Sequence, residues 1–88
     1  MKYSLNQIEN ITSGKLYGSS SCIIHAILTD SRKYFDSEYL FFAIRGMYND
    51  GHQYISKLYN GGLRAFVVEA LPEIDDYPEA GFVLVKNS

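Results

Sequence analysis

The feature that most constrains the fold is a pair of apolar runs separated by an amphipathic segment. The first run, LFFAI at residues 40–44, is typical of a buried strand. Residues 52–60 carry apolar side chains at helical spacing and are followed by two glycines that favour a helix end. Residues 64–69, RAFVVE, predict a second strand. This order predicts a βαβ unit, in which the two strands are parallel.

Shorter segments complete the predicted domain. Residues 5–12 have helical periodicity, and Ser4 with Gln7 has the form of a capping box. Further strands are predicted at residues 15–18, 22–28 and 82–85. The chain has 88 residues, which is enough for one domain spanning residues 1–88. We therefore predict a small single α/β domain with a mostly parallel sheet and short flanking helices.

Composition excludes several classes of function. The formal net charge is −2 and no block of Lys or Arg is present, so nucleic acid is not an expected partner. No stretch approaches the roughly 20 apolar residues of a membrane span, and the N-terminus lacks the apolar segment of a secretory signal. The single Cys22 cannot form an internal disulfide, which fits a reducing, cytoplasmic compartment. With eight Tyr and five Phe, we expect some rings on a surface that another domain or chain covers.

Two polar loops flank the apolar run at residues 40–44. The first contains Asp30, Ser31 and Arg32, and the second is RGMYNDGH at residues 45–52. Ligands of α/β folds bind at loops that follow strands, and parallel strands bring both loops to one edge of the sheet. Glycines allow close approach of backbone N–H groups, arginines suit phosphate, and hydroxyl and amide groups suit a sugar or pyrimidine. Residue types therefore favour a nucleotide or sugar-phosphate site, without a triphosphate-binding G-x-x-x-x-G-K-[ST] loop.

Three other interpretations are open at these loops. Ser31, His52 and either Asp30 or Asp50 have the composition of a nucleophilic triad, but no G-x-S-x-G elbow surrounds the serine. Asp30, Asp50 and His52 are metal-ligating types without a recognised spacing. Finally, the chain can be a docking module whose aromatic surface contacts a partner while its loops bind nothing.

The order of the motifs resembles the N-terminal domain of the Mur ligases, of the MurE and MurF type. The resemblance spans nearly the whole chain, and the fragments are specific together although each is weak alone. The matching positions are Asp30-Ser31-Arg32, LFFA at 40–43, Gly46, Asp50-Gly51-His52, Tyr54, Ile55, Gly62, Ala65 and the two valines at 67–68. Residues 58–68 are most similar to the MurF form that some bacteria fuse to an alanine racemase. The loop tip at residues 47–49 is bulkier than in many relatives.

This resemblance implies a role in peptidoglycan synthesis. In the family, the N-terminal domain holds the uridine diphosphate end of the UDP-N-acetylmuramoyl-peptide, while the other domains bind ATP, magnesium and the incoming amino acid or dipeptide. The chain is therefore expected to be an excised domain that needs no cofactor and catalyses nothing, with pyridoxal phosphate required only by a fused racemase. The residues expected to contact the ligand are Ser31, Arg32, Gly46, Met47, Tyr48 and Asn49. The residues expected to hold the loops in shape are Asp30, Asp50, Gly51 and His52.

Overall fold

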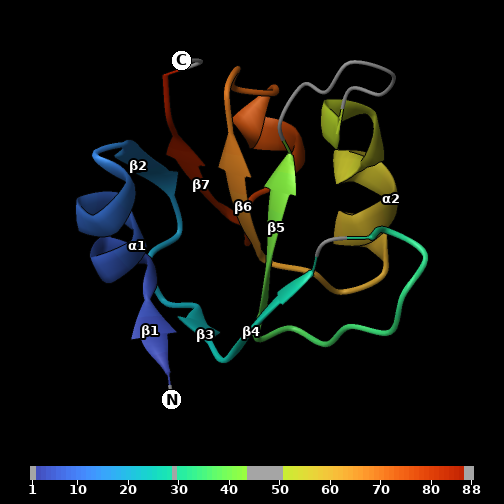
Figure 1. The fold of residues 1–88 in the computed structure, drawn as a ribbon. Coiled ribbons are helices and arrows are strands. Elements are labelled where there is room, and N and C mark those ends of the chain that lie inside the picture. The colour runs from blue at the N-terminus through green and yellow to red at the C-terminus, as the bar shows by residue number, and fades with distance from the viewer. Residues whose placement is uncertain (1, 29, 44–50, 87–88) are drawn as a thin grey trace.

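The computed structural model describes residues 2–28, 30–43 and 51–86, which form a five-stranded sheet, a two-stranded sheet and short helices (Figure 1). The strands are β1 (Tyr3–Ser4), β2 (Lys15–Gly18), β3 (Ile23–Ile24), β4 (Ala26–Leu28), β5 (Tyr39–Ala43), β6 (Ala65–Val68) and β7 (Gly81–Leu84). The helices are α1 (Leu5–Thr12) and α2 (Ile55–Asn60), with 3-10 turns η1 (Gly51–Tyr54) and η2 (Ile74–Asp76).

The larger sheet has the strand order β2-β7-β6-β5-β4. Strands β4 to β7 are parallel to one another, and only β2 runs antiparallel, against β7. In the register of β5 with β6, Leu40 lies opposite Ala65 and Ala43 lies opposite Val68. The predicted βαβ unit and the mostly parallel sheet are therefore confirmed.

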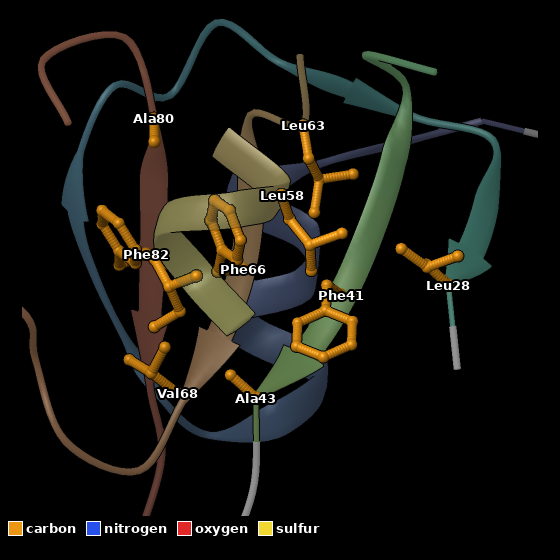
Figure 2. Packing of buried hydrophobic residues seen from close by; sticks show 10 residues of the cluster. Leu28, Phe41, Ala43, Leu58, Leu63, Phe66, Val68, Ala80 and Phe82 are labelled. Atoms are coloured by element: carbon orange, nitrogen blue, oxygen red, sulfur yellow. The ribbon is translucent and has the colours of Figure 1, made fainter. Parts of the chain in front are cut away.

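Side chains alternate between the two faces of the sheet along each strand, so each face buries a cluster of apolar side chains. On β5, Phe41 and Ala43 point into a cluster closed by α2, whereas Leu40 points into a cluster closed by α1. Figure 2 shows the first cluster, where Leu58 of α2 meets the strand side chains and the rings of Phe66 and Phe82 lie side by side. Those two rings are stacked with centroids 5.2 Å apart.

The predicted first helix is confirmed at residues 5–12, capping box included. The Gln7 N–H donates to Ser4 Oγ (3.2 Å), and the Ser4 N–H donates to Gln7 Oε1 (2.8 Å). These bonds satisfy N–H groups that a helix leaves unpaired at its start. The helix ends at Ser13, which adopts the left-handed conformation with φ of 57°.

Two elements differ from the sequence prediction. Residues 22–28 are not one strand, because β3 pairs with β1 while β4 pairs with β5 in the other sheet. His25 lies at the change of sheet, and its N–H donates to the Glu38 carbonyl (2.8 Å). The segment predicted as a helix from residue 52 begins as the 3-10 turn η1 and becomes α-helical only at Ile55. Asp50 lies outside the described residues.

Candidate functional site

The parallel strands bring three chain segments to one edge of the sheet. Strands β4, β5 and β6 end at Leu28, Ala43 and Val68, and the segments that follow leave from this carboxyl edge. The geometric premise for a site between the two polar loops is thus met. The segment after β6, beginning at Glu69, joins the same edge, although its sequence carries no signal for a site.

Asp30, Ser31 and Arg32 form a tight polar turn after β4. Asp30 Oδ1 accepts from the Arg32 N–H (2.9 Å) and from Arg32 Nε (3.1 Å), and Asp30 Oδ2 accepts from an Arg32 terminal nitrogen (2.9 Å). This double contact is the fork geometry that makes arginine–carboxylate pairs specific. Arg32 is 82% exposed, so one side of its guanidinium stays open to a ligand, and Ser31 is half-buried. Asp30 therefore binds both the backbone and the side chain of Arg32, and its loop-shaping role stays a prediction.

The same pair sets the charge of the turn. Hydrogen bonds from the Arg32 side chain and N–H lower the pKa of Asp30 from 3.8 to about 2, and the Asp30 carboxylate raises the pKa of Arg32. Because the pKa of Asp30 is lowered by folding, its stabilising contribution is present above the unfolded value near 3.9 and is lost as the pH falls through about 2.

We expect a carbon-detected NMR titration of Asp30 to show a midpoint near pH 2. In Arg32→Gln the midpoint should return toward the ordinary value of 3.8, because the hydrogen-bonded cation is gone. Lys33→Gln is the matched control, since Lys33 makes the smallest contribution to the lowered pKa. An unchanged midpoint in Arg32→Gln would contradict the paired turn.

His52 is held by the backbone that leaves β6. Its Nε2 accepts hydrogen bonds from the N–H groups of Glu69 (3.1 Å) and Ala70 (3.2 Å). Because that lone pair is already used, Nε2 is not available as a general base for Ser31. The contact therefore rules out a triad in which Nε2 is the base, and the loop-shaping role of His52 stays a prediction.

The remaining predicted site residues are placed only in part. Gly51 is half-buried and begins η1. Gly46, Met47, Tyr48, Asn49 and Asp50 lie outside the described residues, so the second half of the predicted site stays a prediction.

Among residues 2–28, 30–43 and 51–86, no group of three His, Cys, Asp or Glu side chains is placed to hold a metal ion. Within these ranges, no helix has the length and apolar character needed to cross a membrane.

Comparison with known proteins finds no family model that matches the chain. It finds curated relatives: UDP-N-acetylmuramoyl-L-alanyl-D-glutamate–2,6-diaminopimelate ligases from Cytophaga hutchinsonii (37% identical over 71 residues) and Phocaeicola vulgatus (39% over 66 residues). A UDP-N-acetylmuramoyl-tripeptide–D-alanyl-D-alanine ligase from Haemophilus influenzae is 38% identical over 69 residues. These matches cover 81%, 75% and 78% of the chain. The chain is a Mur ligase domain of the MurE/MurF type.

Solved structures agree on the fold of this Mur ligase domain. Two structures of MurF from Acinetobacter baumannii superpose with TM-scores of 0.81 and 0.80 over 97% of the chain, at 24% identity. The chain spans 13–15% of the length of the curated relatives and 18% of the length of the MurF chains. The N-terminal-domain assignment is thus supported, whereas no comparison supports the racemase fusion.

The Mur ligase domain also has an apolar hollow away from the two loops. It has a volume of about 400 Å³ and lies between α1 and the β4–β5 part of the sheet. Ile11 (66% exposed), Ile27 (56%) and Phe42 (36%) line it.

Of the described aromatic residues, Tyr34 is the most exposed, whereas most rings pack against the two clusters. Tyr34 and Phe42 thus place some rings on the surface, as expected, and a domain or chain that covers them stays a prediction.

A polar hollow of about 580 Å³ lies at the opposite, amino edge of the sheet. Arg64 lines this hollow, and the Arg64 guanidinium lies 4.3 Å from the Tyr59 ring centroid. The same side chain donates to the carbonyls of Tyr59 (2.9 Å) and Leu63 (3.0 Å) and pairs with Glu79 (3.4 Å). Because Arg64 is engaged within the fold, it serves to join α2, β6 and the segment before β7.

Proposed function

We propose that this domain binds the uridine diphosphate end of a UDP-N-acetylmuramoyl-peptide at the carboxyl edge of its sheet. The observation that carries the proposal is the likeness, over about four fifths of the chain, to ligases whose names specify a UDP-N-acetylmuramoyl substrate. The turn at Asp30–Arg32 supports it, because this turn presents a hydroxyl and an exposed guanidinium where α/β folds bind ligands.

Each residue of the turn has a separate part in this proposal. Ser31 hydrogen-bonds the base or ribose through its hydroxyl, which can donate and accept. Arg32 faces a phosphate, and Asp30 holds the guanidinium in a fixed plane, which lowers the entropy lost on binding. Gly46 and Asn49 supply backbone and amide groups, and Met47 and Tyr48 supply a wall for the base. Those four assignments follow from residue type and from the family resemblance.

The activity of the whole protein is also part of the proposal. A ligase of this family uses ATP and magnesium in a separate domain and adds an amino acid or dipeptide to the bound peptide. The 88-residue chain should accordingly bind the nucleotide sugar but neither hydrolyse ATP nor ligate. A cytoplasmic location stays a prediction, and pyridoxal phosphate enters only if a racemase is fused.

Titration of the ¹⁵N-labelled 88-residue chain with UDP-N-acetylglucosamine tests the site. We expect the largest amide shifts at Asp30, Ser31 and Arg32 and at the start of η1, because these residues lie at the proposed contact. Amides around the apolar hollow, such as those of Ile11 and Ile27, should move little. Shifts confined to the hollow, or an absence of saturable shifts, would favour the docking module instead.

A further inference from the structure

His52 joins two segments that are distant in the sequence. It lies in η1, at the start of the helix that follows β5, and its Nε2 accepts from the N–H groups of Glu69 and Ala70 just after β6. These two hydrogen bonds tie η1 to the backbone at the end of β6. One imidazole nitrogen therefore satisfies two consecutive backbone donors at the carboxyl edge of the sheet.

The chemistry of the contact fixes the form of the ring. A nitrogen that accepts from N–H groups carries a lone pair, so the ring proton of neutral His52 lies on Nδ1. A proton on Nε2 would place a donor against two donors and break both contacts. Among other side chains of similar reach, only glutamine offers a neutral acceptor near the position of Nε2.

The turn that His52 holds and the loop that carries Arg32 pack on the same core cluster. Tyr54 lies two residues after His52 in η1, and its ring packs against the core cluster under α2. Phe35, from the same loop as Arg32, packs on the same cluster. The shared cluster therefore connects η1 to the loop that carries Arg32.

We infer that His52 is a positioning residue for the nucleotide site, and this inference rests on the proposed function. By accepting from Glu69 and Ala70 in its Nδ1–H form, His52 fixes η1 against the end of β6. The fixed turn keeps Tyr54 on the cluster that Phe35 also contacts, three residues after Arg32, and thereby steadies the loop that offers Arg32 to the ligand. The segment after β6 thereby becomes part of the support of the site through its backbone N–H groups.

Four forms of the 88-residue chain test this role: the parent, His52→Leu, His52→Gln and His25→Leu. Calorimetric titration with UDP should show about fivefold or more weaker affinity for His52→Leu, because two donors lose their acceptor. His52→Gln should restore much of the affinity through its side-chain oxygen. His25→Leu is the matched control, since the ring of His25 lies by Asp36 and Tyr39 and not at the carboxyl edge.

Two further readouts separate positioning from general stability. Without ligand, the ¹⁵N shifts of the His52 ring should show the Nδ1–H form, and the Arg32 amide should shift in His52→Leu more than in His52→Gln. Equal UDP affinity for all four chains, or a proton found on Nε2, would overturn the inference. A parent chain that binds no UDP would overturn the proposed function and with it this role for His52, whereas the ring shifts would still report whether the contact exists.

Discussion

Replacing Phe41 with alanine is expected to lower the free energy of unfolding by about 3–5 kcal/mol. Phe41 is 4% exposed and packs in the cluster between α2 and the sheet, where Figure 2 shows its ring below Leu58. The loss combines the removed apolar surface with the cavity that the ring leaves behind. Because small domains have total stabilities of about 5–15 kcal/mol, the variant should be largely unfolded or close to it. Urea denaturation followed by circular dichroism measures the change.

Phe42→Ala is the matched control for this prediction. Phe42 is the next residue of the same strand but lies on the opposite face, with 36% of its surface exposed. The same ring removed there should cost much less, because solvent already reaches it. Equal losses for the two variants would mean that the two faces of β5 are wrongly assigned.

Gly81→Ala should destabilise the domain by about 3 kcal/mol or more, at the upper end of the cost of overpacking. Gly81 lies at the start of β7, between β2 and β6, with Gly18 and Ala65 as its register partners. A Cβ at this position would overlap the Ser19 carbonyl oxygen and Leu5 Cδ1. The Ser19 backbone cannot retreat easily, because its N–H donates to the Ala80 carbonyl (3.0 Å). Thermal unfolding of the variant measures the loss.

Gly61→Ala is the control for the effect of adding a methyl group. A Cβ there would meet the end of the Phe35 ring at 2.9 Å, and that side chain can shift. The Gly61 φ of −83° is one that alanine adopts without strain. We expect a much smaller change than in Gly81→Ala, and a similar loss in both would contradict the close approach of β2 to β7.

The main elements of the fold were predictable because their signals are local. The capping box at Ser4 and Gln7 lies within four residues, and the continuous apolar runs within residues 40–44 and 64–69 are typical of buried strands. The break at His25 was not predictable, because one polar residue inside an otherwise apolar run does not by itself indicate a change of sheet. Only the pairing of Ile24 with Tyr3 and of Ala26 with Tyr39 divides that run between two sheets.

The candidate site follows the same division between local and distant contacts. The pair of Asp30 with Arg32 links residues two apart, and such side-chain-to-backbone turns are typical of aspartate. The contact of His52 with the N–H groups after β6 spans 17 and 18 residues and uses backbone donors. Any sequence offers such donors, so residue types at 69–70 could not indicate it. The sequence therefore predicted a role for His52 but not its partner.

The measurement that tests the central claim most directly is UDP affinity of the parent chain, Ser31→Ala and Ser20→Ala. Ser20 is an exposed serine in the segment between β2 and β3, distant in the sequence from both polar loops, and is the matched control. Removing a hydroxyl that binds the ligand should cost about 1–3 kcal/mol, which corresponds to roughly 5- to 150-fold weaker affinity. We predict that loss for Ser31→Ala and parent-like affinity for Ser20→Ala, with all three chains folded. Equal affinity for the three chains, or no saturable UDP binding by the parent, would contradict a uridine diphosphate site at the turn after β4.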